Sequence, residues 1–325
     1  MATYKEIKGT NIEVLASDPS NPVEGQVWYN STSAVLKGQA ATTAGVWATT
    51  NSLNQSREAL ASATSAPAST SLVFLGFNNP TKYAQTEKFN GTSWTELNDA
   101  NTARANASGF GVSTAAIAAG GYLGPPGSTA IVESWNGTNW TEVNDLNQHK
   151  YTSGAAGTST AGLVFGGGTT PPYSLLTQTE TWNGTNWTEV NDLNTARTAL
   201  GGCGATNTEA LAFGGNVSPQ AQTESWNGTN WTEVNDMNTG RASVGSAGIY
   251  TSALAAGGTP PTTGKTETWN GTNWTEEGDL NTARQELEGG GTTSSAVMAG
   301  GQPPITAASE EWTGAGPVTR TFTDS

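Results

Sequence analysis

The chain has 325 residues, and only 34% of them are hydrophobic, although it carries 12 Trp and 41 Gly. This composition excludes an ordinary core of Leu, Ile and Val, so tryptophan and closely packed small residues must supply the burial. Its 13 basic and 27 acidic residues give a net charge of −14. We therefore expect no nucleic-acid partner and no anionic membrane surface, because phosphates require clusters of Lys and Arg.

Targeting signals and cysteine chemistry are equally sparse. The single cysteine, Cys203, excludes an internal disulfide and a metal site built from clustered cysteines. The first residues, MATYKEIKGTNIEV, carry charges where a signal peptide needs an apolar segment. No apolar run approaches the ~20 residues of a membrane helix. We expect synthesis in a cytoplasm without a signal peptide, no membrane insertion and no cofactor.

Residues 1–45 lie outside any repeat and form an N-terminal arm. Within it, Gln26 to Gly38 (QVWYNSTSAVLKG) predicts a short hairpin. Trp47, Leu53 and Arg57 then match Trp187, Leu193 and Arg197 of the repeat that follows. We interpret Trp47 as the last strand of a repeat unit whose other strands are elsewhere in the chain.

The stretch TETWNGTNWTEVNDLNTAR, from Thr179 to Arg197, recurs five times in full and twice in part. The second tryptophan of each full copy is spaced by 46, 47, 44 and 43 residues: Trp94, Trp140, Trp187, Trp231 and Trp274. Repeats of this length indicate a solenoid, a propeller or an array.

Each copy also predicts a hairpin. A two-residue Asn183-Gly184 loop would form a type I′ turn and make Trp182 and Trp187 diagonal neighbours; a loop from Asn183 to Asn186 would place them directly opposite. In either case both indoles share one face of the hairpin.

Four strands are predicted per repeat: a Gly/Ala/Ser-rich strand, an apolar strand ending in Gly-Gly, a strand ending in Glu-x-Trp, and the second Trp strand. The pattern makes six units, and the last one lacks a second Trp after Trp312. Closure of a ring by the Trp47 strand would satisfy both ends and remove exposed sheet edges. The alternative is that Val318 to Phe322 is the fourth strand and that Trp47 begins an incomplete seventh blade with the Trp28 hairpin.

The fixed order of Gly-Gly, Glu-x-Trp, Trp and Arg resembles a Kelch-type β-propeller over residues 47–312. The resemblance implies an all-β, six-bladed propeller with four antiparallel strands per blade, and seven blades as the alternative. It divides the chain into an attachment or oligomerisation arm (1–45), a propeller (46–315) and a C-terminal tail (316–325). The NPVEGQVWYNSTSAVLKG stretch and the WNGTNW turns are also similar to structural and tail proteins of marine tailed bacteriophages.

Residues present in every unit are expected to be scaffold, and function is expected where the units differ. Arginine recurs at one repeat position in five units, with Lys150 at that position in the remaining one, and glutamate recurs at another. We expect these charges to bridge strands or neighbouring blades, and the alternative is a charged ring that binds an ion at the axis. The arginines are Arg57, Arg104, Arg197, Arg241 and Arg284; the glutamates are Glu87, Glu133, Glu180, Glu224, Glu267 and Glu310.

Residues suited to catalysis are scarce in this sequence. His149 is the only histidine, and we interpret it as a surface variant; Cys203 lies in a Gly-rich strand and is expected to be buried. The Asn-Asp loops, such as Asn191-Asp192, supply too few carboxylates for calcium, so we expect Asx-turns and no metal. No nucleophile with a base can be assigned, and we expect a protein that is not an enzyme.

The variable loops between the second and third strands are the better candidates. They are proline-rich, and strand alternation places them on the face opposite the Asn-Gly turns. Exposed apolar side chains on such loops form a predicted binding surface, unless they pack on each other or on the arm. These residues are Tyr122, Leu123, Tyr173, Leu175 and Leu176.

Together these features predict a non-enzymatic virion structural protein of a bacteriophage, a tail fibre, tail-associated or capsid-decorating module. The arm would bind other virion proteins or form a homo-oligomer, and the loop face would bind a host-surface glycan, a host protein or a neighbouring subunit. The alternative is a carbohydrate-binding, lectin-like propeller without a virion role.

Overall fold

The computed structural model describes residues 12–19, 25–40, 44–125, 127–216, 221–315 and 318–322. This part of the chain is all-β, and the 3-10 helix η2 (Ala68–Thr70) is its one helical element. No helix within it is long and apolar enough to cross a membrane. The chain forms two compact units, Val46–Thr313 and a smaller unit that combines Met1–Gly45 with Gly314–Ser325.

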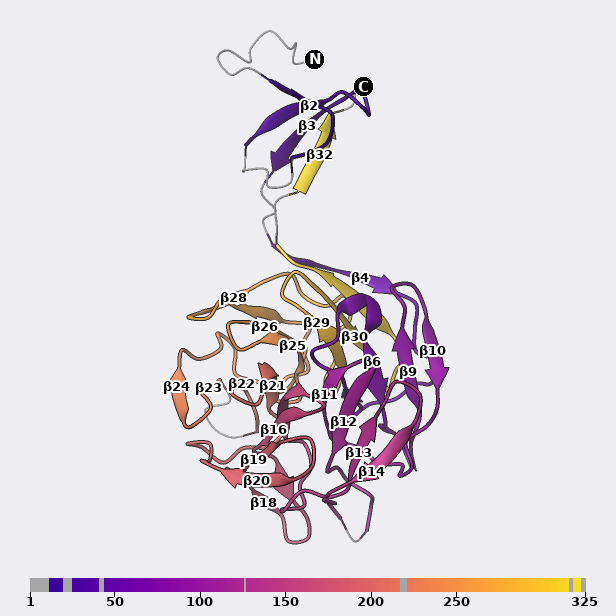
Figure 1. The fold of residues 1–325 in the computed structure, drawn as a ribbon, viewed down its shortest axis with the longest axis vertical. Helices are drawn as coiled ribbons and strands as arrows, with labels where there is room; N and C mark the ends of the chain where they lie inside the picture. Colours follow the sequence, from indigo (N-terminus) through magenta and orange to yellow (C-terminus); the bar gives the residue numbers. More distant parts are fainter. Residues whose placement is uncertain are drawn as a thin grey trace. The chain divides into compact units, whose positions relative to one another are not determined.

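The larger unit contains six four-stranded antiparallel sheets arranged around a common centre (Figure 1). In chain order they are β5 (Ala61–Ser62), β6 (Leu72–Phe74), β9 (Thr86–Phe89) and β10 (Trp94–Leu97); β11 (Ser108–Val112), β12 (Ala115–Ala119), β13 (Val132–Trp135) and β14 (Trp140–Val143); β15 (Gly154–Thr158), β16 (Ala161–Phe165), β19 (Thr179–Trp182) and β20 (Trp187–Val190); β21 (Gly201–Thr206), β22 (Glu209–Phe213), β23 (Thr223–Trp226) and β24 (Trp231–Val234); β25 (Gly245–Ile249), β26 (Ser252–Ala256), β27 (Thr266–Trp269) and β28 (Trp274–Glu276); and β29 (Glu288–Gly291), β30 (Ser295–Ala299), β31 (Ser309–Thr313) and β4 (Val46–Thr50).

The first strands of these sheets contact one another in a closed order, from β5 through β11, β15, β21, β25 and β29 back to β5. Glycine makes the close approach feasible. A Cβ on Gly202 of β21 would lie 2.8 Å from the backbone nitrogen of Ala155 in β15. A ring of small-residue inner strands with larger residues outside is consistent with a β-propeller.

The last sheet is completed by the N-terminal strand β4. It pairs antiparallel with β31, and Trp47 lies opposite Trp312 with ring centroids 5.2 Å apart. The predicted alternative, in which Val318–Phe322 closes this sheet, is wrong because that segment, β32, pairs with β3 (Val35–Ala40). The chain thus enters and leaves the larger unit at the same sheet.

The smaller unit is a sheet in the order β1-β2-β3-β32. It comprises β1 (Glu13–Leu15) parallel to β2 (Val27–Asn30), and β2 forms a hairpin with β3. Asp18 accepts hydrogen bonds from Lys37, Asn30 and the indole of Trp28, which lower the pKa of its carboxyl to about 2.

The assignment of residues 316–325 to a tail is therefore corrected. Residues 318–322 form a strand because β3 offers an unpaired edge, and residues 316–317 and 323–325 lie outside the described residues. Residues 1–11, 20–24 and 41–43 of the predicted arm also lie outside them.

Each Trp hairpin closes through a four-residue loop. Trp182 lies directly opposite Trp187, with ring centroids 5.1 Å apart. The side chain of Asn183 accepts the backbone N–H groups of Thr185 and Asn186, and Gly184 has a φ of +89°. The two-residue type I′ turn is wrong because Asn183 satisfies the loop through its side chain rather than by a positive φ.

Candidate functional site

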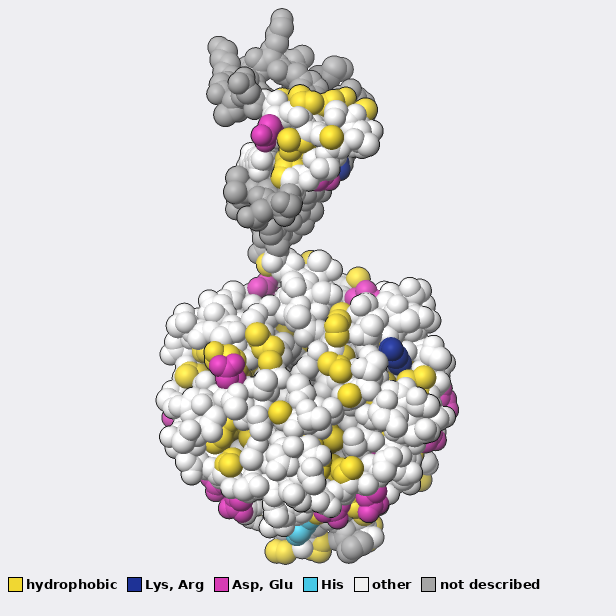
Figure 2. All heavy atoms as spheres, viewed as in Figure 1, with side chains coloured by type: hydrophobic (Ala, Val, Ile, Leu, Met, Phe, Trp, Pro, Cys, Tyr) yellow, Lys and Arg dark blue, Asp and Glu magenta, His cyan; other side chains and the backbone are white. Residues whose placement is uncertain are grey.

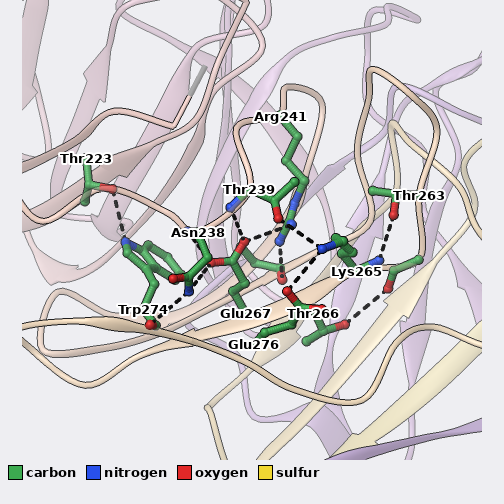
Figure 3. A network of polar contacts seen from close by, with 12 residues as sticks. Thr223, Asn238, Thr239, Arg241, Thr263, Lys265, Thr266, Glu267, Trp274 and Glu276 are labelled. Atoms are coloured by element: carbon green, nitrogen blue, oxygen red, sulfur yellow. Dashed lines mark hydrogen bonds and ion pairs between the residues drawn. The ribbon is translucent and has the colours of Figure 1, made fainter. Parts of the chain in front are cut away.

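A glutamate on the third strand of each sheet bonds to the connection that enters that sheet. Figure 3 shows the network around Glu267. One oxygen of Glu267 accepts the backbone N–H and the side-chain amide of Asn238 at 2.7 and 3.0 Å, and the other lies 3.0 Å from Arg241. Asn238 also donates to the carbonyl of Trp274, 3.0 Å away on the fourth strand. The connection is thus joined to two strands of the next sheet.

The same ion pair occurs in all six sheets, with N–O distances of 2.5–3.1 Å: Arg57–Glu87, Arg104–Glu133, Lys150–Glu180, Arg197–Glu224, Arg241–Glu267 and Arg284–Glu310. Every one of these side chains is buried, which lowers the pKa of each guanidinium and of Lys150, while the partner glutamate opposes the shift. The visible face of the larger unit accordingly shows little basic surface (Figure 2). We call these ion pairs with their asparagines the Glu hubs.

Tryptophan joins neighbouring sheets. The indole N–H of Trp231 donates to Thr179 Oγ1 of the preceding sheet at 3.0 Å, and its ring meets Phe165 of that sheet edge-on at 4.8 Å. Trp140, Trp274 and Trp47 make the same bond to Thr86, Thr223 and Thr266. Trp187 instead donates to the Asn144 carbonyl, and Trp94 Nε1 is buried without a partner among the residues that the structure describes. The repeated tryptophans are therefore used for packing between sheets.

A ring of backbone hydrogen bonds surrounds the axis two residues after each hub cation. Each member has a positive φ of 51–56° and donates its N–H to the carbonyl of the preceding member at 2.8–3.1 Å, and the ring closes on itself. This axial ring comprises Ala59, Asn106, Thr152, Ala199, Ser243 and Glu286. The hydrogen bonds stabilise a conformation that non-glycine residues otherwise adopt at a cost.

The axis is closed beyond the ring by residues 63–71 of the first sheet, which we call the plug. The backbone N–H of Ser65 donates to the Gly111 carbonyl at 3.2 Å, and its hydroxyl reaches the carbonyls of Gly157 and Gly204, each at 3.5 Å. Ala63 and Ala66 are fully buried. The plug thus contacts three other sheets at the end of the inner strands away from the axial ring. We call the space along the axis between the axial ring and the plug the funnel.

Two small cavities lie along this funnel. The outer one, of about 60 Å³, is lined by the axial ring and by Glu288. The inner one, of about 30 Å³, is lined by Glu288, the plug residue Thr64 and the hydroxyls of Ser62, Ser108, Ser153 and Ser246. Glu288 therefore belongs to both cavities.

Burial raises the pKa of the glutamates around the funnel. It raises that of Glu288 to about 8, opposed by hydrogen bonds from Ser62 and the Gly289 N–H, and that of Glu58 to about 7, with a contribution from Glu286. The pKa of Glu286 is also raised, chiefly by burial. Sequence reasoning missed this group, although Glu58 and Glu286 lie one and two positions after a repeated cation, where the residue changes from unit to unit.

The predicted loop residues are only partly brought together. Tyr173 is 59% exposed, whereas Tyr122, Leu123, Leu175 and Leu176 are half-buried, so the five residues differ in exposure and their role in binding stays a prediction. Their loops fold back: Leu176 donates its N–H to the Gly167 carbonyl, and Tyr122 bridges to Ala105.

Three residues that the prediction omitted, Phe77, Lys82 and Tyr151, lie with the predicted tyrosines beside the funnel. The rings of Tyr122 and Tyr151 lie 6.0 Å apart, and Lys82 Nζ lies 5.3 Å from the Tyr122 ring and 5.4 Å from that of Phe77. We call Phe77, Lys82, Tyr122, Tyr151 and Tyr173 the loop surface. Tyr151 could have been found because it follows Lys150, where four of the other units have Ala, Thr or Gln.

The remaining candidates have local roles. Asp192 accepts the N–H of Thr179 and the hydroxyl of Thr177, so this Asn-Asp loop is fastened to its own sheet. His149 is half-buried, with Nδ1 2.7 Å from Ser128 Oγ. Cys203 is fully buried, which raises the pKa of its thiol.

Comparisons with known proteins inform the fold alone. No protein family and no curated protein matches the sequence. Among solved structures, that of YjhT matches with a TM-score of 0.65 over 84% of this chain and 97% of its own, at 12% identity. The likeness supports a β-propeller.

Proposed function

We propose that this protein is a non-enzymatic virion structural protein of a tailed bacteriophage, in which a six-bladed Kelch-type propeller is displayed for binding. Six four-stranded sheets whose inner strands contact in a closed order support the blade count. The repeated Gly-Gly, Glu-x-Trp and Arg positions support the Kelch assignment.

The observation that carries this proposal is a small sheet built from segments that precede and follow the propeller in the chain. The strands β1 to β3 and β32 come from opposite ends of the sequence, and the whole propeller lies between them in the chain. A domain held at both ends is suited to display, because the smaller unit can attach without using the propeller surface. Among the described strands β1 lies at an edge of this sheet, and Val14 on it is 67% exposed, which suits pairing with another virion protein or another copy.

The propeller would bind through the funnel side, where the units differ. The Glu hubs and tryptophans are used for folding, whereas the loop surface offers aromatic rings and a lysine. Binding surfaces are commonly built from variable loops on a rigid scaffold. The partner would be a host-surface molecule or a neighbouring subunit.

Purified virus particles labelled with an antibody against this chain test the proposal. We expect label at one regular position, and loss of the protein from particles when residues 1–45 and 314–325 are both deleted. Absence of the chain from washed particles would contradict a virion role, and retention of the truncated chain would contradict attachment through the smaller unit.

Tyr173 favours a second candidate, a carbohydrate-binding propeller without a virion role. Its ring is 59% exposed beside two other tyrosines, and flat aromatic faces bind sugar rings. Binding to a glycan array that is lost in Tyr173→Ala, by a protein absent from particles, would favour this candidate.

A further inference from the structure

We propose that the inner cavity of the funnel binds a small monovalent cation, an alkali ion or ammonium, through the Glu288 carboxylate and the hydroxyl of Thr64. This inference concerns a different site from the loop surface and stands independently of the virion role.

Within the part of the chain that the structure describes, Glu288 has few hydrogen bonds and no cation as a partner. Its carboxylate accepts one hydrogen bond from Ser62 Oγ at 3.0 Å and one from the Gly289 N–H. None of the ion pairs among the described residues includes it, and no Lys or Arg lines the two cavities beside it. Glu288 is half-buried, and a carboxylate with little access to water and no cation beside it is costly to ionise, a cost that a bound cation would offset.

A hydroxyl without a hydrogen-bond partner lies at the same cavity. Thr64 is 5% exposed and lines the inner cavity, and its Oγ1 is buried without a hydrogen-bond partner in the part of the chain that the structure describes. Buried polar groups normally have partners, so an orphaned hydroxyl on a residue that lines a cavity indicates a ligand there. Thr64 is placed by the plug, whose crossing of the axis brings it to the inner cavity.

The remaining lining favours a cation over an anion. Ser108 donates its hydroxyl to the Ser153 carbonyl and Ser246 donates to that of Gly202, each at 3.0 Å, so their oxygen lone pairs are the groups left for a ligand. The described residues that line the outer cavity include Glu286 and Glu288, those of the inner cavity include Glu288, and neither set contains a Lys or Arg. An anion would find acceptors and negative charge there.

Size and charge favour a monovalent ion. An inner cavity of about 30 Å³ is large enough for an ion with about one water. Calcium requires six to eight oxygens with several carboxylates, and no group of three acidic, His or Cys side chains able to hold a metal exists among the described residues. One carboxylate with hydroxyls matches a single positive charge.

Crystals of the full chain grown at pH 9 in rubidium chloride test the site directly. We expect an anomalous peak in the inner cavity, within coordination distance of Glu288 and Thr64, that is absent from Glu288→Gln crystals. No peak, or an undiminished peak in Glu288→Gln, would overturn the proposal.

Thermal unfolding of the full chain at pH 9 distinguishes the ions. At equal ionic strength we expect Tm to rise by about 2–5 °C in sodium, potassium or ammonium chloride relative to N-methylglucamine chloride, whose cation is too large to enter. A rise in Tm with ammonium but not with sodium or potassium would assign an ammonium site, and a rise with an alkali ion but not with ammonium would assign an alkali-metal site.

Glu288→Gln and Thr64→Val should reduce the rise in Tm, whereas Glu189→Gln, the same charge change on an exposed strand, should retain it. Equal Tm in all salts, or a response to calcium alone, would overturn the assignment.

Discussion

The Glu hubs and the axial ring each occupy one place in every sheet, yet their chemistry differs. Each hub uses an acidic side chain that accepts from a cation and an asparagine, and all six hubs retain the glutamate. Each ring position uses only backbone N–H and C=O, and its side chains run from Ala59 to Glu286. Side chains that the scaffold requires are repeated, and those that it does not require differ.

This difference separates stability from binding. Removing one side chain of a Glu hub leaves its partner's charge buried between strands. Substituting a side chain of the axial ring or the loop surface leaves the backbone hydrogen bonds intact. We therefore expect substitutions to become less destabilising from the hubs to the funnel, to the tryptophans and to the loop surface.

The largest effect is expected at a hub. Glu224→Ala leaves Arg197 buried without its carboxylate and removes the acceptor for Asn194. Breaking a buried ion pair by removing one partner costs about 3–5 kcal/mol. Urea unfolding should report that loss. Glu233→Ala is the matched control because Glu233 lies directly opposite Glu224 in the same hairpin but is exposed, and it should cost about 0.5 kcal/mol or less. Equal losses in the two variants would contradict a special role for the hub.

The funnel should make stability depend on pH. The pKa of Glu288 is raised to about 8 from an ordinary 4.5, so between these values the unfolded carboxyl has lost its proton and the folded one keeps it. Stability should fall as pH rises through this window, by about 2 kcal/mol after allowance for solvent screening. Glu58, with a pKa of about 7, acts in the same direction.

Urea unfolding from pH 5 to pH 9 in N-methylglucamine chloride measures this slope without a small cation. Glu288→Gln should flatten it, because an amide does not titrate. A slope unchanged in Glu288→Gln would show that another group is responsible.

The tryptophans should give a smaller, graded effect. Trp231→Phe loses the bond to Thr179, whereas Trp94→Phe loses no bond because Trp94 Nε1 has no partner among the described residues. Beyond the packing loss common to both, Trp231→Phe should cost about 1 kcal/mol more. Chemical denaturation of the two variants checks this difference, and equal losses would mean that packing alone joins the sheets.

Much of the fold could be predicted because each repeat unit carries the same residue types at the same positions. The Gly-Gly, Trp and Glu positions indicated four strands per unit, and the missing Trp after Trp312 with the copy at Trp47 indicated the closing strand. The fate of Val318–Phe322 could not be predicted, because pairing with β3 depends on an edge that is formed elsewhere in the sequence.

The candidate site was predicted less well. Tyr173 was found because an exposed aromatic on a variable loop is visible in the sequence. The axial ring and the contacts of the plug were not, because they depend on hydrogen bonds between residues more than 40 positions apart.

The smallest effect on stability is expected at the loop surface. Tyr173 is 59% exposed, so Tyr173→Ala removes little buried area and should cost about 0.5 kcal/mol or less in urea unfolding. If this ring is part of the binding surface, the same variant should bind less to host cells or glycans. Leu175→Ala is a useful counterpart, because Leu175 is half-buried in the same loop and should lose more stability and less binding. A large loss of stability in Tyr173→Ala would place Tyr173 with the scaffold, and the distinction between repeated and variable positions would then fail at its most exposed member.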